Sequence, residues 1–268
     1  MLHKVAAPGS LPEVHALLAA DSSARILAGG TALMPLANAG SDDITTLVSL
    51  RRAGLSGISV EGGRAVIGAA ATLTDLAGTP ALAFLLPALD AIASPTIRNM
   101  ATVGGNLFVS QPYGDLAACL LALDATVRID GAAGLREVPV AEVTARSLAP
   151  GDIVTSVAFE LPAQGSFCFA KAGRKALNAA AIVTVAAIVD IAGGIVSSSR
   201  IALGGVAQRP VRAVSVERAL AGKPFDADHV MAAAREAAHD IDPFDDAYAS
   251  AWYRARVTPV HIRRALLG

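Results

Sequence analysis

The chain has 268 residues, of which 53% are hydrophobic and 17% are charged. Its 22 Lys and Arg residues are balanced by 23 Asp and Glu residues, which gives a formal net charge of -1. A nucleic-acid-binding protein usually has a clear basic excess, so this balance argues against a nucleic-acid partner. The hydrophobic content is enough to build a sizeable core, which excludes a disordered segment.

Cysteine content and hydropathy bear on the location of the chain. Its two cysteines, Cys119 and Cys168, can form neither a disulfide framework nor a four-thiolate cluster, and this favours a cytoplasmic protein. No apolar secretory signal follows the first residues. The longest uncharged stretches, 76–89 and 178–189, are shorter than the roughly 18 residues that span a bilayer, so we expect no transmembrane segment.

The first half of the chain mixes helix and strand signals. Ser10 followed by Pro12 predicts a helix start, and residues 25–27 are typical of a strand that enters a Gly-Gly pair. A hairpin is predicted at 58–67, where two β-type runs flank a glycine turn. Residues 81–93 and 116–123 are predicted to be buried helices.

A second region begins near Gly165, after a Pro and Gly boundary at 162–166. We expect strands at 167–170, 182–191 and 195–203, with a hairpin turn between the last two. Three helices should follow: one capped by Asp226 or Asp228, one over 247–257 and one over 259–267. This order of elements indicates a mixed α/β or α+β chain, with domains at 1–164 and 165–268.

Two glycine-rich loops are the strongest functional signals: AGGTALMP at 28–35 and ATVGGNL at 101–107. Paired glycines let the backbone approach a ligand and turn N–H groups toward an anion such as a pyrophosphate. Each pair alone is more often a tight turn. Neither loop fits G-x-G-x-x-G or GxxxxGK[ST], so a nucleotide cofactor would have to be shared by both loops in a fold other than the Rossmann fold.

Charged residues add a second, weaker signal. Asp115 begins a predicted helix, where a carboxylate either caps the helix or accepts hydrogen bonds from sugar or ribityl hydroxyls. Lys171, Arg174 and Lys175 form a basic cluster at a strand end, suited to a phosphate or an anionic ring, although such a cluster is by default a solvated face. The five histidines have no metal-ligand spacing.

Taken together, these segments resemble the FAD-binding (medium) subunit of the molybdenum hydroxylases, the family of xanthine dehydrogenase, carbon monoxide dehydrogenase and aldehyde oxidoreductase. The resemblance covers nearly the whole chain. It is carried by AGGTALMP, IRNMATVGGNL at 97–107, PYGDLAACLLALDA at 112–125, KAGRK at 171–175, RIALGGVAQRPVRA at 200–213, SAWYRARV at 250–257 and HIRRALL at 261–267. Lys175 departs from the pattern, because many relatives have an arginine there.

The resemblance implies a fold of the vanillyl-alcohol-oxidase/p-cresol-methylhydroxylase type. Two subdomains, at about 1–55 and 56–164, would enclose FAD, and an α+β domain with a three-stranded sheet and helices would follow. The residues implied in cofactor binding are Ile26, Leu27, Ala28, Gly29, Gly30, Thr31, Ala32, Leu33, Ile92, Thr102, Val103, Gly104, Gly105, Asn106, Asp115, Ile153 and Lys171. The two loops would hold the pyrophosphate, Asp115 would hold polar groups of FAD, and Lys171 would lie beside the flavin.

The implied function is an electron-transfer flavoprotein subunit. It would take electrons from a small [2Fe-2S] subunit and pass them to an external acceptor, while substrate is hydroxylated at a molybdopterin cofactor in a large subunit. A heterotrimer or a dimer of heterotrimers is expected. Two alternatives stay open: a self-sufficient FAD-dependent reductase of the same fold, and a non-catalytic scaffold, against which the intact glycine loops argue. Substrate, acceptor and the role of Tyr113 are not determined by the sequence.

Overall fold

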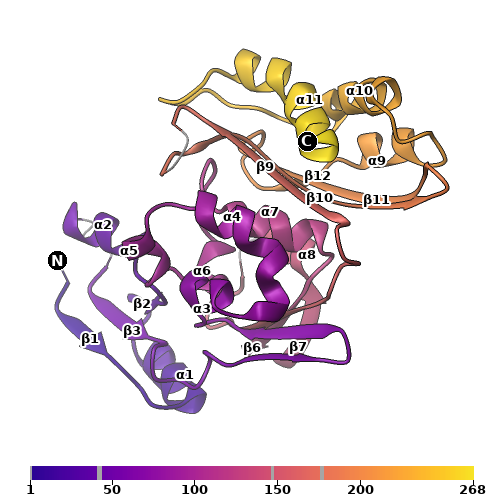
Figure 1. Ribbon diagram of the computed structural model, residues 1–268. Helices are drawn as coiled ribbons and strands as arrows, with labels where there is room; N and C mark the ends of the chain where they lie inside the picture. Colours follow the sequence, from indigo (N-terminus) through magenta and orange to yellow (C-terminus); the bar gives the residue numbers. More distant parts are fainter. Residues whose placement is uncertain (1, 41–43, 146–147, 176–177) are drawn as a thin grey trace. The chain divides into compact units, whose positions relative to one another are not determined.

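The computed structural model describes residues 2–40, 44–145, 148–175 and 178–268. Its strands form three sheets, which belong to two compact units (Figure 1). Unit 1 comprises Met1–Thr79, Pro95–Phe108 and Thr126–Ala158, and unit 2 comprises Pro80–Ser94, Val109–Ala125 and Phe159–Gly268. The units interleave along the chain, because residues 80–94 and 109–125 pack with the C-terminal sheet.

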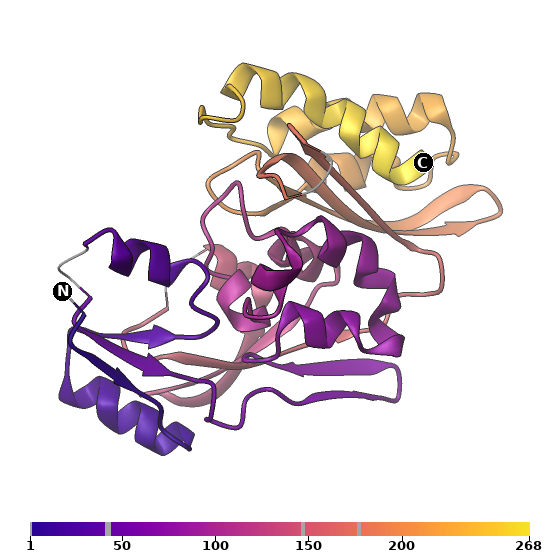
Figure 2. The same ribbon diagram turned by 60° about the vertical axis from the view of Figure 1, so that its left-hand side comes forward.

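Unit 1 contains a small parallel sheet in the order β1-β3-β2. Its strands and helices are β1 (Lys4–Ala6), α1 (Leu11–Ala20), β2 (Ala24–Leu27), α2 (Leu33–Asn38) and β3 (Thr46–Ser49). As expected, Ser10 caps α1, its side chain accepting the Glu13 N–H. Val14 of α1 packs with Val48 and Ile153 in a hydrophobic core, and Figure 2 shows α1 lying beside the sheet.

Unit 1 also contains a five-stranded sheet in the order β4-β5-β8-β6-β7. The strands are β4 (Ile58–Glu61), β5 (Arg64–Gly68), β6 (Thr126–Gly131), β7 (Gly134–Pro139) and β8 (Ile153–Glu160). The accompanying helices are α3 (Leu73–Ala77), α5 (Pro95–Arg98), α6 (Val103–Asn106) and α8 (Val140–Ala145). The predicted hairpin is confirmed, and its turn glycines, Gly62 and Gly63, have φ values of 58° and 84°.

Unit 2 is built on an antiparallel sheet in the order β12-β11-β10-β9. The strands are β9 (Phe167–Gly173), β10 (Ala181–Ala192), β11 (Ile195–Gly204) and the two-residue β12 (Val211–Arg212), which lies at the edge beside three long strands. The predicted strands and the Gly193–Gly194 turn are confirmed. Nine consecutive residues of β10 are buried, because helices cover both faces of the sheet.

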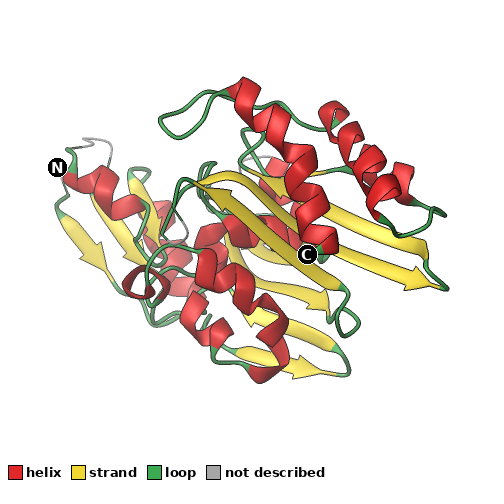
Figure 3. Ribbon diagram, turned by 45° about the horizontal axis from the view of Figure 1, so that its top comes forward, coloured by secondary structure: helices red, strands yellow, loops and turns green. Residues whose placement is uncertain are grey.

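Helices on the two faces of this sheet come from distant parts of the chain. The helices α9 (Val214–Leu220), α10 (Ala227–Arg235) and α11 (Ala251–Leu267) lie on one face, and α4 (Leu86–Ala91) and α7 (Asp115–Ala122) lie on the other (Figures 1 and 3). The short η1 (Pro80–Leu85) precedes α4, and η2 (Glu236–His239) follows α10. Asp226 is the N-cap of α10, one of the two expected candidates.

Two helix predictions were wrong. The single helix expected over 81–93 is η1 followed by α4, because Pro87 lacks the N–H that a continuous helix needs. The two helices expected at 247–257 and 259–267 are one helix, α11, with Pro259 inside it. Packing compensates for the missing hydrogen bond, since Thr258, Ile262 and Leu266 are buried on both sides of that proline. The prediction also omitted α9.

Candidate cofactor-binding site

The first glycine loop joins β2 to α2 in unit 1. A Cβ atom on Gly29 would lie 1.9 Å from the carbonyl oxygen of Met100, so the backbone can pass there only without a side chain. Gly30 has a φ of 74°, which also favours glycine. The conformation of this loop therefore requires glycine at both positions.

The second glycine loop forms α6 and is held against the turn after β5. Thr102 caps it by accepting the Gly105 N–H at 3.1 Å. The Gly104 N–H donates to the Ala69 carbonyl at 2.9 Å, and a Cβ on Gly104 would lie 2.8 Å from the Ala69 Cβ. The two loops are neighbours, since a Cβ on Gly105 would lie 3.7 Å from the Ala28 Cβ.

These contacts give a different explanation for why two positions, Gly29 and Gly104, must be glycine. From the sequence, we expected the missing side chains to allow the close approach of a ligand. In the structure, the Cβ positions of Gly29 and Gly104 face neighbouring protein backbone instead. Their absence lets the two loops pack closely inside unit 1.

Backbone N–H groups of the first loop are available to an anion. The Met34 N–H donates to the Gly30 carbonyl at 2.9 Å, but within the described ranges no hydrogen bond is donated by the N–H groups of residues 29–33. The loop is partly exposed. Successive free N–H groups in a turn form an anion-binding concavity, so the loop fits a pyrophosphate.

In unit 2, Asp115 is the first residue of α7, and the N-cap is Gly114, which provides no side-chain cap. The Asp115 Oδ2 atom lies 2.7 Å from the Lys171 Nζ atom, and Oδ1 accepts a hydrogen bond from the Thr184 hydroxyl. Lys171 also donates to the Ala91 carbonyl at 3.0 Å. The side chains of Lys171 and Asp115 are 10% and 5% exposed, so the pair is buried. Asp115 is thus a partner of Lys171 rather than a helix cap.

Thr184 was missed by the sequence analysis. It is fully buried in β10. The signal was present, because Thr184 is a hydroxyl inside an otherwise apolar buried run, and a buried hydroxyl needs a partner.

A cavity of about 210 Å³ lies beside Lys171 in unit 2. Ala91, Phe169 and Lys175 are among its lining residues. This volume is smaller than typical cofactor pockets, so the cavity can admit only part of a dinucleotide. Two donors of the ammonium are used by Asp115 and Ala91, which leaves one of its three for a ligand.

The remaining predicted contacts lie in apolar surroundings. Ile153 is 1% exposed and lies in the core beneath α1, where Ile26 packs against the same cluster. Ile92 is 7% exposed and is the C-cap of α4. Of the predicted residues, unit 1 brings together the two loops and unit 2 brings together Asp115 and Lys171.

Tyr113, whose role the sequence left open, is half-exposed in the turn before α7. Its hydroxyl lies 2.7 Å from the hydroxyl of Tyr248. This hydrogen bond and partial burial raise the pKa of Tyr113 to about 12. A tyrosine in this network stays neutral at physiological pH.

Two adjacent glycine loops, the first with free N–H groups and neither with a Rossmann fingerprint, are the arrangement expected of a nucleotide-binding protein outside the Rossmann class. Comparison with known proteins gives the family. Residues 2–163 match the model of the FAD binding domain in molybdopterin dehydrogenase, and residues 167–268 match the C-terminal domain of the CO dehydrogenase flavoprotein. The chain is 32% identical to the carbon monoxide dehydrogenase medium chain of Afipia carboxidovorans, covering 97% of this chain and 93% of that one.

Further relatives belong to the same family of molybdenum hydroxylase subunits. The putative xanthine dehydrogenase FAD-binding subunit of Escherichia coli is 31% identical to this chain, and the match covers 92% of this chain and 87% of that subunit. The solved carbon monoxide dehydrogenase of Hydrogenophaga pseudoflava matches with a TM-score of 0.93 and 32% identity, over 99% of this chain and 96% of that chain. Quinoline 2-oxidoreductase from Pseudomonas putida matches with a TM-score of 0.91 and 30% identity, over 100% and 96%.

The chain belongs to the family of FAD-binding medium subunits of molybdenum hydroxylases, as the resemblance implied. It is an oxidoreductase subunit with an FAD-binding domain. Among the described residues, no group of three or more His, Cys, Asp or Glu side chains could hold a metal ion. No helix in the same part of the chain is long and apolar enough to cross a membrane.

Proposed function

We propose that the chain is the electron-transfer flavoprotein subunit of a molybdenum-containing hydroxylase or dehydrogenase. It takes electrons from a [2Fe-2S] subunit and passes them to an external acceptor. The observation that carries the proposal is the first glycine loop, whose N–H groups are free and which packs beside the second glycine loop, in a chain that matches medium subunits over its length. FAD, when bound, supplies the redox chemistry.

The loops of unit 1 bind and orient the cofactor in this proposal. The N–H groups of residues 29–33 hold the pyrophosphate, and Thr102, Val103, Gly104, Gly105 and Asn106 form the adjacent wall. Gly29 packs closely against the Met100 backbone, which supports the conformation of the loop. N–H donors that are already held in place bind an anion without the free-energy cost of ordering the loop.

Lys171 provides a fixed positive charge in unit 2. Its ammonium is held by Asp115 and by the Ala91 carbonyl, and it lies at a cavity. A cation beside a flavin stabilises the negative charge that the ring gains on reduction. We therefore assign to Lys171 the role of raising the flavin potential, and to Asp115 that of orienting Lys171.

The proposed partners are a large subunit with the molybdenum cofactor and a small [2Fe-2S] subunit, in a heterotrimer or a dimer of heterotrimers. This assignment is supported by relatives whose names identify them as a medium chain or as a subunit of a dehydrogenase complex, such as the 6-hydroxypseudooxynicotine dehydrogenase complex subunit alpha of Paenarthrobacter nicotinovorans, 32% identical over 94% of this chain and 90% of its own.

The test is co-expression of this chain with large and small subunits encoded beside it. Size-exclusion chromatography with metal and flavin analysis should show one complex that contains molybdenum, iron and FAD. Substrate should then reduce the flavin only when the small subunit is present. If the chain alone turned over substrate fully, without molybdenum or iron, the result would support the alternative of a self-sufficient FAD-dependent reductase.

A further inference from the structure

Three strands of the sheet in unit 2 place Lys171, Thr184 and Gly204 side by side. In the antiparallel register, Thr184 of β10 is paired with Lys171 of β9 and with Gly204 of β11. Directly paired residues of neighbouring antiparallel strands point to the same face of a sheet. That face is the one that α7 covers, because the side chains of Lys171 and Thr184 both bond to Asp115, the first residue of α7.

The Thr184 hydroxyl is the second side-chain partner of the Asp115 carboxylate. Thr184 is 0% exposed and is the one polar residue in the buried stretch 181–189 of β10. A carboxylate accepts hydrogen bonds and donates none, so the hydroxyl donates to Asp115 Oδ1, while Asp115 Oδ2 lies 2.7 Å from Lys171 Nζ. Each oxygen of the carboxylate therefore has its own donor, and the two donors together fix the rotation of the carboxylate.

The backbone before Asp115 is anchored independently to the same sheet. Gln111 Oε1 accepts the Gly205 N–H at 2.5 Å, and the Pro112 carbonyl accepts the Ala181 N–H at 3.1 Å. These two bonds tie the segment to β10 and to the end of β11. The freedom that remains to Asp115 is therefore rotation of its side chain, which the hydrogen bond from β10 restrains.

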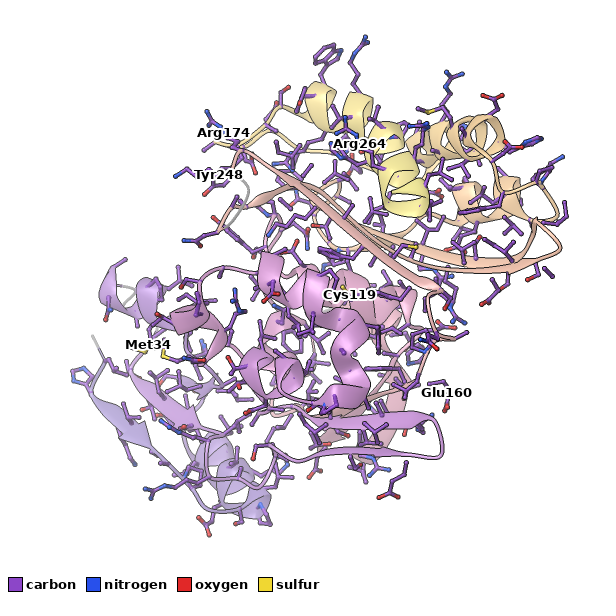
Figure 4. All side chains as sticks on the ribbon, in the orientation of Figure 1. Met34, Cys119, Glu160, Arg174, Tyr248 and Arg264 are labelled. Carbon is purple, nitrogen blue, oxygen red and sulfur yellow. The ribbon has the colours of Figure 1, made fainter. Side chains whose placement is uncertain are left out.

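Helix α7 holds Asp115 from the other side. All 8 residues of α7 are buried, and the helix packs against β10 and β11. Figure 4 labels Cys119, one turn after Asp115 in this helix, and the Cys119 side chain is fully buried. The helix start is therefore held in place, and its first carboxylate lies directly against the strand that carries Thr184.

Gly204 leaves the space that Thr184 and Gln111 occupy. A Cβ atom on Gly204 would lie 3.3 Å from the Thr184 Cβ atom and 3.4 Å from Gln111 Oε1, so a larger residue would press on both side chains. Gly204 belongs to the segment RIALGGVAQRPVRA, to which the glycine-loop site gives no role. Close packing around Thr184 explains why this position of the segment is glycine.

We propose that Thr184 is a positioning residue for Lys171. Its hydroxyl fixes the Asp115 carboxylate, and the carboxylate holds the Lys171 ammonium at the cavity that Lys171 lines. Because Asp115 and the Ala91 carbonyl take two of the three ammonium N–H groups, the position of the carboxylate sets the direction of the third. The effect of Thr184 on the flavin rests on the proposed function, which places the cofactor beside Lys171.

The first measurement uses the full chain without flavin. NMR of the isotope-labelled chain gives the rate at which the Lys171 ammonium exchanges protons with water, and Lys171→Met identifies its signal. Thr184→Val keeps the shape of the side chain and removes the hydroxyl donor. With one donor of Asp115 lost, the ion pair opens more often, so we expect exchange to become about tenfold faster.

Thr184→Ser and Thr258→Val are the matched controls. Thr184→Ser retains the hydroxyl, so the ammonium should exchange at the wild-type rate. Thr258 is also 0% exposed, and its hydroxyl donates to the Arg254 carbonyl within α11 at 2.7 Å. Thr258→Val therefore removes a buried hydroxyl elsewhere in unit 2, and it should leave the exchange of the Lys171 ammonium unchanged.

The second measurement is the midpoint potential of the flavin in the chain loaded with FAD. An ammonium that is held less firmly stabilises the negative charge of a reduced flavin less well. We expect Thr184→Val to lower the equilibrium constant for flavin reduction about fivefold, which is about 20 mV for a two-electron couple. Thr184→Ser and Thr258→Val should keep the wild-type potential.

The outcomes separate the role of Thr184 from the proposed function. If the ammonium of Thr184→Val exchanges at the wild-type rate, Thr184 does not position Lys171 and the proposal is wrong. Equal acceleration in Thr258→Val would also overturn it, because the cause would then be a general loss of stability. If exchange becomes faster in Thr184→Val alone and the flavin potential stays unchanged, the positioning role stands and the role of Lys171 in raising the flavin potential is wrong.

Discussion

Ala32 is the N-cap of α2 and lies among the free N–H groups of the first loop, and its side chain is exposed. Ala32→Asp would place a carboxylate beside those groups, where it competes with the pyrophosphate for positive potential. We expect this variant to bind FAD roughly tenfold more weakly, as measured by quenching of flavin fluorescence. Ala32→Asn, of the same shape without the charge, should bind FAD nearly normally; equal loss in both variants would contradict the electrostatic account.

We expect the buried ion pair of Lys171 and Asp115 to contribute to the free energy of unfolding. Lys171→Met leaves a buried carboxylate whose one remaining side-chain partner among the described residues is the Thr184 hydroxyl, and it should cost about 3–5 kcal/mol of unfolding free energy. Adding Asp115→Asn removes the uncompensated charge, so the double variant should be more stable than Lys171→Met alone. Urea unfolding of the three proteins measures this. Identical midpoints for Lys171→Met and wild type would show that solvent reaches the pair.

Besides the apolar packing of Ile262 and Leu266, the buried side chain of Arg254 ties helix α11 to the sheet by hydrogen bonds. Arg254 is 0% exposed, and its Nη1 atom donates to the carbonyls of Ala181, Ile182 and Gly205 at 2.7–3.0 Å. Its Nη2 atom lies 2.6 Å from Asp246 Oδ2. Arg254→Met would leave these acceptors unsatisfied, so we expect a loss of about 3 kcal/mol or more in urea unfolding.

Asp246 adds a pH dependence to the same contact. Burial raises the pKa of Asp246, but the N–H groups of Ala249 and Tyr248 and the Arg254 guanidinium outweigh burial, so the pKa falls below its usual 3.8. A lowered carboxyl pKa contributes stability that is present above the usual value and is lost as the pH falls toward the lowered one. Asp246→Asn should therefore be less stable than wild type at about pH 7, and the difference should shrink below about pH 4. A difference independent of pH would contradict this.

The elements that the sequence predicted are those with local signals. The hairpin at 58–67 and the Gly193–Gly194 turn follow from turn glycines, and α7 follows from its apolar run. Helix α11 did not follow, since Pro259 is a local stop signal that buried neighbours override. The three carbonyl partners of Arg254 lie 49 to 73 residues away in sequence, so no local pattern could indicate them.

Across the whole molecule, the candidate site residues also divide into those that local sequence signals indicate and those that only tertiary contacts reveal. The two loops were recognisable from their glycines, yet the reason for Gly29 is the Met100 carbonyl, which the sequence does not place beside it. Asp115 and Lys171 were named separately, and their pairing appears only once α7 and β9 lie in one unit. Residue types indicated the chemistry, whereas tertiary contacts determined which groups are free to bind.

We expect the chain to bind FAD through its glycine loops, as a medium subunit does. The most direct measurement is identification of the cofactor that the purified, then denatured, chain releases, by chromatography against FAD and FMN standards. We expect about one FAD per folded chain, and a yellow protein before denaturation. Release of FMN, or no flavin from a folded chain after incubation with FAD, would contradict it.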